Sequence, residues 1–429
     1  MQIIPELKAG AKEIDIAANI NNRQEVMEMF TSAYGKGHRV NKKFETIRFH
    51  NDKINIDITY FKEGIKKDLL RRDFRLNSIA WNKKNGFFDP LSGIEDIKKK
   101  KINYCEKESI KNDPVRILRA LRISLKHNFS LSESLKTQIA KNKHLIAKFP
   151  GERIRKELKK GFEINPIQFS KLMIEIEIFE NLFKAWKETK KCQANSISKM
   201  NVEKHSLKTL ENLEKIISCP EKYYPNWGKY FKKLNKPQWW MYLGVLLHDI
   251  GKPKTICINE KKITYPRHAQ IGFDLVEKDI ENLKLSKEEK NGIQAIISNH
   301  LRVSQLANNN ELPTKRAINK FFRNLKELSI FFIFLDLADA SAYPKKVTEQ
   351  ILTKNHLKIH DFLLDSFFLK KEKILPEPLL NGKDLIQIGY KEGPLIGKTL
   401  KKITNLQISE KIKNTEEALK YASEELNTK

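Results

Sequence analysis

The chain of 429 residues contains few cysteines and no long hydrophobic run. The four cysteines lie far apart without a C-x-x-C pair, and the amino-terminal sequence lacks the basic and then apolar pattern of a secretory leader. No run of 18 or more apolar residues is present, so a membrane span is not expected. We therefore expect a protein of the reducing cytoplasm that has no membrane partner.

Acidic residues are scarce relative to basic ones. The sequence has 53 Asp and Glu against 81 Lys and Arg, a formal net charge of +28. This excess favours polyanionic partners through phosphate contacts and counterion release. The alternative is a coding bias, because Lys, Ile and Asn are abundant throughout and runs such as 98–101 are typical of solvated faces. The charge is thus compatible with nucleic acid but does not select it.

Strand-like periodicity is concentrated in about the first 103 residues. The segment EIDIAAN (13–19) alternates apolar and acidic positions, and INIDITYF (54–61) repeats the pattern. Between them, NRQEVMEMF (22–30) predicts a helix. A length of 429 residues is typical of about three domains, so the amino-terminal part is expected to be a small α/β domain.

Helical patterns dominate from about residue 104 onward. NDPVRILRALRISL (112–125) predicts a helix with Asp113 as N-cap and Pro114 at its first position. SKEEKNGIQAIISNH begins with Ser286 and Glu289 at the spacing of a capping box. The tail after about residue 345 predicts helices with turns at NGKD and KEGPLIG. The first of these helices would bury Val115, Leu118, Leu121 and Leu125 and project a row of three arginines, Arg116, Arg119 and Arg122.

The two predicted strands present carboxylates at a spacing that suits metal binding. Glu13 and Asp15 are two residues apart, so both leave the same face of a strand and, with Asp57, can share hard cations. Nucleotidyl transfer needs such metal-bound carboxylates. The alternative is that they are solvent-facing positions of a half-exposed sheet.

The segment RRDFRLNSIAW (71–81) is a candidate nucleotide contact. A helix here would place Asp73 and Asn77 on one face, where both can address a ribose or base, while Arg71 and Arg72 meet phosphate oxygens. The alternative is a capped surface helix that buries Phe74, Leu76 and Ile79.

The order of several segments is specific. KEIDIAAN, RRDFRLNSIAW, FFDPLSGIEDI, NDPVRILRALR and GERIRKEL follow one another, and the chain ends with LLNGKDLIQIGYKEGPLIGKTL. This order resembles the class II tRNA nucleotidyltransferase (CCA-adding enzyme) and bacterial poly(A) polymerase family. The resemblance implies a multidomain fold with a polymerase-β-like α/β head, a mostly helical neck, an HD domain and a helical tail, at residues 1–103, 104–195, 196–345 and 346–429.

The resemblance also implies roles for individual residues. Asp15 matches the second metal carboxylate, and Glu13 takes the place of the first, which is normally aspartate. Asp73 and Asn77 match the contact to the nucleotide sugar. Asp113 and Arg116 match the pair that reads the base edges of CTP and ATP. The remaining nucleotide-binding candidates are Arg71, Arg72, Arg119 and Arg153; Arg153 and Glu157 match a supporting helix, or form a plain i,i+4 ion pair.

Three departures from the family pattern are visible. The glycine pair and Arg-Asp that form a triphosphate cradle do not precede Glu13, so the head is expected to be shortened at its amino terminus. The stretch from Tyr60 to Arg71 is short, as in family members that add only CC. Asn112 stands where the family has glutamate, and Arg75 replaces a small hydroxyl residue.

A second constellation is built on LLHDIGKP (246–253). A lone His-Asp pair is usually structural, but here the companions of His248 and Asp249 follow the order seen in HD-domain phosphohydrolases. This resemblance implies a site for one or two divalent ions (Mg²⁺, Mn²⁺, Ni²⁺ or similar) that activate water against a phosphate ester. The expected ligands are His205, His248, Asp249, His268, His300 and Asp339.

The resulting hypothesis is a nucleotidyltransferase that acts on the tRNA 3′ end, adds C, A or both from CTP and ATP with Mg²⁺, and has an associated HD phosphohydrolase. One alternative is a poly(A) polymerase. Another is a degenerate head that serves only as an RNA-binding module beside an active HD phosphatase or phosphodiesterase. The sequence leaves these open, along with the choice between CCA, CC and A addition and the oligomeric state.

Overall fold

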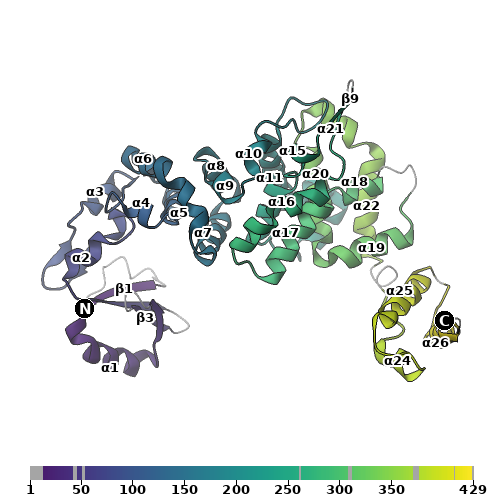
Figure 1. Cartoon of the computed structure of the whole chain (residues 1–429), viewed down its shortest axis with the longest axis horizontal. Helices are drawn as coiled ribbons and strands as arrows, with labels where there is room; N and C mark the ends of the chain where they lie inside the picture. The colour runs from purple at the N-terminus through teal and green to yellow at the C-terminus, as the bar shows by residue number, and fades with distance from the viewer. Residues whose placement is uncertain are drawn as a thin grey trace. The chain divides into compact units, whose positions relative to one another are not determined.

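The computed structural model describes residues 13–41, 46–50, 54–259, 262–307, 312–370, 376–409 and 411–427. The chain divides into two compact units: residues 1–165 with 172–181, and residues 166–171 with 182–429 (Figure 1). The expected four-part division stays a prediction. In the part of the chain that is described, no helix has the length and apolarity needed to cross a bilayer.

The amino-terminal unit begins with a four-stranded sheet in the order β1-β4-β3-β2. Strand β1 runs parallel to β4, and the other two pairs are antiparallel. Helix α1 (Arg23–Tyr34) places Phe30 in the apolar cluster of the sheet. The two predicted strands (β1 and β4) and the predicted helix are therefore confirmed, whereas β2 and β3 were not predicted. The strand bounds are β1 (Glu13–Asn19), β2 (His38–Asn41), β3 (Thr46–His50) and β4 (Asn55–Phe61).

Period-two alternation makes this sheet two-faced. Ile56 and Ile58 are buried with Phe49 and Ile47 on one face, while Asp57 between them faces the other way. The sheet can thus bury one side and present carboxylates on the other.

The rest of the amino-terminal unit is mostly helical, and α5 packs against α7. Two short strand pairs interrupt it: β5 with β6 antiparallel, and β7 with β8 parallel. The elements are α2 (Ile65–Leu70), η3 (Arg75–Asn77), β5 (Ala80–Asn82), β6 (Gly86–Phe88), α3 (Gly93–Lys98), β7 (Lys101–Ile102), α4 (Ser109–Asn112), α5 (Arg116–His127), β8 (Ser130–Leu131), α6 (Glu133–Asn142), η4 (Lys143–Lys148) and α7 (Gly151–Ile164). Helices α8 (Pro166–Glu175) and α9 (Ile178–Leu182) follow.

The start of α5 differs from the prediction. The helix begins at Arg116, and Asp113 is the C-cap of α4 rather than the N-cap of α5. Pro114 lies between the two helices because a proline cannot continue α4. The apolar stripe is confirmed for Val115, Leu118 and Leu121, which are buried.

The second unit is built around two strongly apolar helices, of which the second also carries Asp336 and Asp339. Helices α14 and α20 are buried along almost their whole length, and α11 packs against both. A helix without a polar face is stable in water only inside a core. The elements are α10 (Trp186–Thr189), α11 (Val202–Ser218), α12 (Pro220–Tyr223), η5 (Pro225–Trp227), α13 (Gly228–Phe231), α14 (Trp239–Leu247), α15 (Lys252–Thr255), β9 (Cys257–Asn259), β10 (Lys262–Thr264), α16 (His268–Asn282), α17 (Lys287–Asn299), α18 (Arg302–Ala307), α19 (Lys315–Leu325), η6 (Lys326–Leu328), α20 (Ser329–Ala340), α21 (Lys345–Ile351), α22 (Lys354–Phe368), α24 (Gly382–Gln387), α25 (Pro394–Ile408) and α26 (Thr415–Asn427).

Two helix starts test the capping predictions. Ser286 and Glu289 form the expected capping box at the start of α17. The predicted turn at NGKD is wrong, because Asn381 is the N-cap of α24. The side chain of Asn381 accepts from the backbone N–H of Asp384, and the side chain of Asp384 accepts from the backbone N–H of Asn381. An Asn followed three residues later by a carboxylate is itself a helix-start pattern. The tail helices share an apolar cluster that includes Leu385 and Ile403.

Candidate functional site

The polar face of the amino-terminal sheet brings the predicted carboxylates together. Asp15 is the register partner of Asp57 on the parallel strand, and Glu13 lies two residues before Asp15. Register partners on neighbouring strands project to the same face. The three side chains therefore share one face, as a common metal site requires.

An arginine that the sequence analysis missed lies beside these carboxylates. The Nε and one terminal nitrogen of Arg48 each donate to an oxygen of Asp57, both at 2.6 Å. Such a bidentate pair holds the carboxylate in one orientation. The alternation in TIRFH, with Ile47 and Phe49 on the apolar side, was the available signal for its position.

The surroundings of Asp15 disfavour its ionised form. Burial raises the pKa of Asp15, the neighbouring Asp57 and Glu13 raise it further, and Arg72 and Arg119 oppose the shift. A bound divalent cation would relieve both the desolvation and the repulsion. Oxygen donors of this kind are the ligands that Mg²⁺ prefers, so the chemistry of the three residues fits that ion. Among the described residues, however, their oxygens do not form a group whose atoms all lie within 4.8 Å of one another.

Asp73 and Asn77 meet as expected, but not on an α-helix. The segment is a turn followed by the 3₁₀ helix η3, which begins at Arg75. One carboxylate oxygen of Asp73 accepts from Nδ2 of Asn77 at 3.0 Å and from the backbone N–H of Phe74 at 2.8 Å. The other lies 2.6 Å from Nε of Arg119. Asp73 is thus a buried carboxylate held from three sides, and its contact with a nucleotide sugar stays a prediction.

Arg116 is engaged by the backbone of this turn. Its terminal nitrogens donate to the carbonyl oxygens of Arg71 and Arg72, each at 2.9 Å. Its Nε lies 3.6 Å from Asp113. The guanidinium therefore fixes the turn that ends at Asp73, and in this arrangement its terminal nitrogens face carbonyls rather than a base.

Replacing Arg116 by alanine is expected to lower the free energy of unfolding of this unit by about 2–3 kcal/mol, because two backbone carbonyls lose charged donors. Urea unfolding followed by circular dichroism measures the change. Arg39→Ala, at an exposed position of β2, is the matched control. Equal stability of the two variants would contradict the role assigned to Arg116.

The expected row of arginines on α5 does not form an unpaired basic surface. Arg119 pairs with Asp73, and Arg122 donates to Glu157 on α7 at 2.7 Å. The i,i+4 pair between Arg153 and Glu157 does not form, because Arg153 instead donates to Asp113 at 2.6 Å. These long-range pairs hold α5, α7 and the turn together. The stretch expected to lack the triphosphate cradle, residues 1–12, lies outside the described residues.

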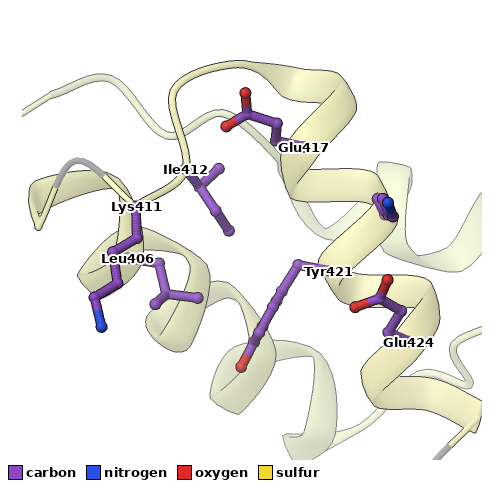
Figure 2. A pocket seen from close by; sticks show the side chains of 7 residues that line it. Leu406, Lys411, Ile412, Glu417, Tyr421 and Glu424 are labelled. Carbon is purple, nitrogen blue, oxygen red and sulfur yellow. The ribbon is translucent and has the colours of Figure 1, made fainter.

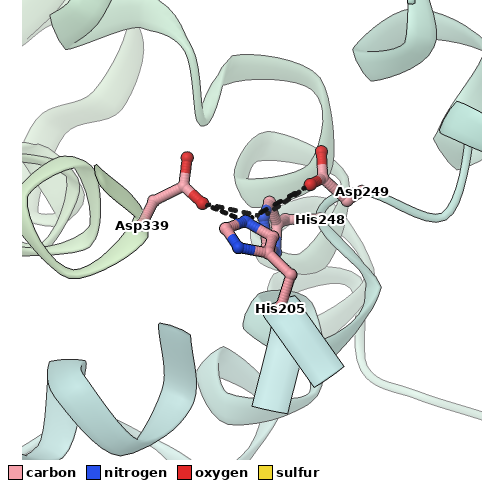
Figure 3. Close-up of side chains that lie close together, drawn as sticks. All are labelled: His205, His248, Asp249 and Asp339. Atoms are coloured by element: carbon pink, nitrogen blue, oxygen red, sulfur yellow. Dashed lines mark hydrogen bonds and ion pairs between the residues drawn. The ribbon is translucent and has the colours of Figure 1, made fainter. Parts of the chain in front are cut away.

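The second constellation closes around Asp249. Nε2 of His205, Nε2 of His248, one oxygen of Asp249 and one of Asp339 converge (Figure 3). The distances from His205 are 2.7 Å to Asp339 and 3.5 Å to Asp249, and those from His248 are 3.3 Å to both. Ligands about 2.0–2.2 Å from one ion lie about 3.0–3.4 Å apart. The four side chains thus have nearly the spacing of a metal shell.

The other oxygen of Asp249 belongs to a second group. It lies 3.3 Å from Nε2 of His268 and 3.5 Å from Nε2 of His300, and the two Nε2 atoms are 3.1 Å apart. The Nδ1 atoms of His268 and His300 lie 2.8 and 2.9 Å from backbone carbonyls. A carbonyl only accepts, so each neutral ring carries its proton on Nδ1 and directs a lone pair from Nε2. Two lone pairs that face each other are stable only with a proton or a metal ion between them.

The pKa shifts of His205, His300 and Asp249 suit metal binding. His248 differs, because burial alone would lower its pKa but the neighbouring Asp249 and Asp339 raise it to about 10, so a metal ion must displace a proton there. Burial lowers the pKa of His205 and of His300, which keeps both imidazoles neutral. Desolvation alone would favour a neutral Asp249, but the ammonium of Lys252, 2.6 Å away, and the neighbouring histidines hold the pKa of Asp249 well below its usual range. All six predicted ligands are brought together. Lys252, three residues after Asp249 in LLHDIGKP, was missed.

Backbone contacts explain the glycine of this segment. His248 follows the end of α14, and Gly251 lies against the start of α16. A Cβ at Gly251 would lie 2.1 Å from the carbonyl oxygen of His268. Only glycine lets the two backbones approach so closely, and this approach places His268 beside Asp249.

The tail has an open hollow that involves none of the predicted site residues (Figure 2). It lies between α25 and α26, and its charged members are of both signs. We assign no chemistry to it. Its lining consists of Leu406, Lys411, Ile412, Glu417, Lys420, Tyr421 and Glu424.

Three family models match the chain. The poly(A) polymerase head domain matches residues 60–103, the probable RNA- and SrmB-binding site of polymerase A matches residues 128–190, and the putative tRNA nucleotidyltransferase domain 2 matches residues 271–422. Together they fall on the head, the neck and the carboxyl-terminal part.

Curated relatives and solved structures agree with these matches. A CC-adding tRNA nucleotidyltransferase of Synechocystis is 27% identical over 363 residues, 84% of this chain and 76% of the relative. An A-adding tRNA nucleotidyltransferase of Deinococcus radiodurans is 23% identical over 372 residues, 84% of this chain and 80% of the relative. A CCA-adding enzyme with ATP matches with a TM-score of 0.58 at 22% identity, covering 99% of this chain and 88% of that one. The Thermotoga maritima CCA-adding enzyme with tRNA has a TM-score of 0.54 at 22% identity, with 98% and 89% covered. The structural matches establish the fold.

Proposed function

Because the chain belongs to the class II tRNA nucleotidyltransferase and poly(A) polymerase family, we propose that it extends the 3′ end of tRNA with C residues from CTP. The observation that carries this proposal is the pairing of Asp15 with Asp57 on one face of the sheet, two residues from Glu13. Similarity of fold alone does not support catalysis, whereas these carboxylates on one face of the sheet do.

Glu13, Asp15 and Asp57 would hold Mg²⁺, which when bound supplies charge stabilisation to the triphosphate and the attacking hydroxyl. The chain's own groups orient the substrates. Arg72 and Arg119, whose charges act on Asp15, would meet phosphate oxygens. Asp73, held by Asn77 and Arg119, would direct a carboxylate at the sugar.

Addition of C alone is favoured over complete CCA addition for two reasons. The link from Tyr60 to Arg71 is short, as in CC-adding members of the family, and its middle is the single helix α2. Three curated relatives that match most of this chain are named for CC addition, in two cases, and for A addition, in one. The base would be read by Asp113, whose carboxylate is held by the half-exposed Arg153.

The test uses tRNA transcripts that end before the CCA sequence, after one C and after CC, each with Mg²⁺ and either CTP or ATP. We expect addition of two C residues and then arrest, with no incorporation of A. Completion of CCA would replace the CC assignment with the CCA type. Long A tails on an unrelated RNA would indicate the poly(A) polymerase alternative, and no extension of any transcript would remove the proposal.

We further propose that the six-ligand constellation around Asp249 is a phosphohydrolase site. The facing Nε2 atoms of His268 and His300 support this proposal, because their Nδ1 atoms lie beside backbone carbonyls and their Nε2 atoms are directed at a common point, as in ligands of one metal ion. Two ligand groups that share Asp249 suit a pair of Mg²⁺, Mn²⁺ or Ni²⁺ ions, which when bound acidify a water molecule. Lys252 would keep Asp249 ionised for that role. A phosphate monoester or a 2′,3′-cyclic phosphate at an RNA 3′ end is the substrate class.

A further inference from the structure

A third cluster of metal-ligating side chains lies apart from both sites. His356 and His360, one turn apart on α22, direct their Nε2 atoms at the same oxygen of Asp336 on α20, at 2.5 and 2.9 Å. All three side chains are buried, with exposed fractions of 4%, 0% and 3% respectively. Two histidines at i and i+4 with a carboxylate from a facing helix form a chelating geometry.

Two of the three ligands have a partner that fixes their orientation. The hydroxyl of Ser304 donates to Oδ1 of Asp336 at 2.5 Å, which is the carboxylate oxygen that the two imidazoles do not contact. The hydroxyl of Tyr224 lies 2.9 Å from Nδ1 of His360. Such partners on the far side of a ligand orient imidazoles and carboxylates in metal sites.

The charge of Asp336 also requires a cation. Its ion-pair partners within the described residues are the two imidazoles. Its surroundings on α20 are apolar, because Phe332, Ile333 and Leu335 have 0% exposure. A buried carboxylate is costly unless a positive charge balances it. That charge is either a proton on the histidines or a metal ion.

We propose that Asp336, His356 and His360 bind one Zn²⁺ ion that ties α20 to α22. Nitrogen and oxygen donors of this kind suit Zn²⁺ and the similar Co²⁺. On binding, the Nε2–Oδ2 separations widen from 2.5 and 2.9 Å to about 3.0–3.4 Å, the spacing of ligands around a zinc ion. The site is closed to solvent, so its role is structural rather than catalytic. It also anchors the helix that presents Asp339 to the phosphohydrolase site, one turn further along.

Cobalt titration of the full chain tests the proposal separately from the phosphohydrolase site. His248→Ala with Asp249→Ala removes ligands from both groups of that site and leaves α20 and α22 intact. After metal removal, this double variant is expected to take up about one equivalent of Co²⁺, with a visible absorption band, and to melt at a higher temperature with Zn²⁺. Absence of stoichiometric Co²⁺ uptake overturns the proposal. The negative charge of Asp336 is then balanced by a proton on the histidines.

A third substitution locates the ion. His360→Gln added to the double variant is expected to abolish the uptake, whereas His144→Gln, at an exposed position of η4, should leave it unchanged. Uptake that survives His360→Gln would overturn the proposal. If the His360→Gln variant does not fold, His356→Gln gives the same comparison. The Co²⁺ uptake of the double variant tests the proposal even if neither of these variants folds.

Discussion

Replacing Asp15 by asparagine is expected to reduce nucleotide addition at least about 10³-fold, equivalent to about 4 kcal/mol of transition-state stabilisation. Asp15 is the register partner of Asp57 and lies two residues from Glu13, so its loss removes the oxygen donor that neighbours both of the others. The measurement is single-turnover extension of a tRNA transcript with labelled CTP across a range of Mg²⁺ concentrations. Excess metal should not restore the rate.

The fold should survive this substitution. Burial raises the pKa of Asp15, so the metal-free protein holds a charge there that is unfavourable at neutral pH. A carboxyl with a raised pKa stabilises the fold below its unfolded pKa and loses that contribution as the pH rises. A neutral amide removes this penalty, so Asp15→Asn should be at least as stable as the parent at pH 7 without metal.

Glu25→Gln, on the exposed side of α1, is the matched control and should extend tRNA at the parental rate. Extension by Asp15→Asn at a similar rate would reject the catalytic cluster. If neither the parent nor the variant extends tRNA while phosphate esters are still hydrolysed, the head is an RNA-binding module rather than an enzyme.

Replacing Asp249 by asparagine is expected to lower metal-dependent hydrolysis of a 2′,3′-cyclic nucleotide at least about 10³-fold. One oxygen of Asp249 faces His205 and His248 and the other faces His268 and His300, so a single change weakens both ligand groups. Hydrolysis with Mg²⁺, Mn²⁺ and Ni²⁺ in turn, together with the metal content of the protein, measures the effect. Chelation of the parent should reproduce the loss, and added metal should reverse it.

Specificity for this site comes from two comparisons. Asp274→Asn, at an exposed position of α16, should hydrolyse the substrate at the parental rate. Asp249→Asn should still extend tRNA, because Asp15 and its neighbours are unchanged. Parental hydrolysis by Asp249→Asn would mean that the constellation is a retained scaffold without activity.

Local patterns were enough to locate several elements. The alternation of Ile14 and Ile16 with Glu13 and Asp15 predicted β1, and Ser286 with Glu289 predicted the start of α17. These signals depend on residues within one turn or a few positions along a strand, so they are readable without tertiary contacts. The start of α5 was misplaced by the same kind of local rule, because Asp113 ends one helix just before the next begins.

Pairings between distant residues were not predictable in this way. Arg48 was overlooked beside Asp57, and Glu157 was assigned to Arg153 although it pairs with Arg122. A long side chain reaches several partners at similar cost, and which one it meets depends on how helices and strands pack. The third cluster, Asp336 with His356 and His360, likewise arises only when α20 and α22 come together.

The sequence by itself determined the family, the mixed character of the amino-terminal part and the types of residue available for two metal sites, because these depend on composition, short periodicity and motif order. Tertiary structure alone decided that Asp15 and Asp57 share a face, that Arg116 holds a turn, and that one carboxylate, Asp249, serves two histidine groups. Such convergence depends on strand register and helix packing, which join residues far apart in the chain.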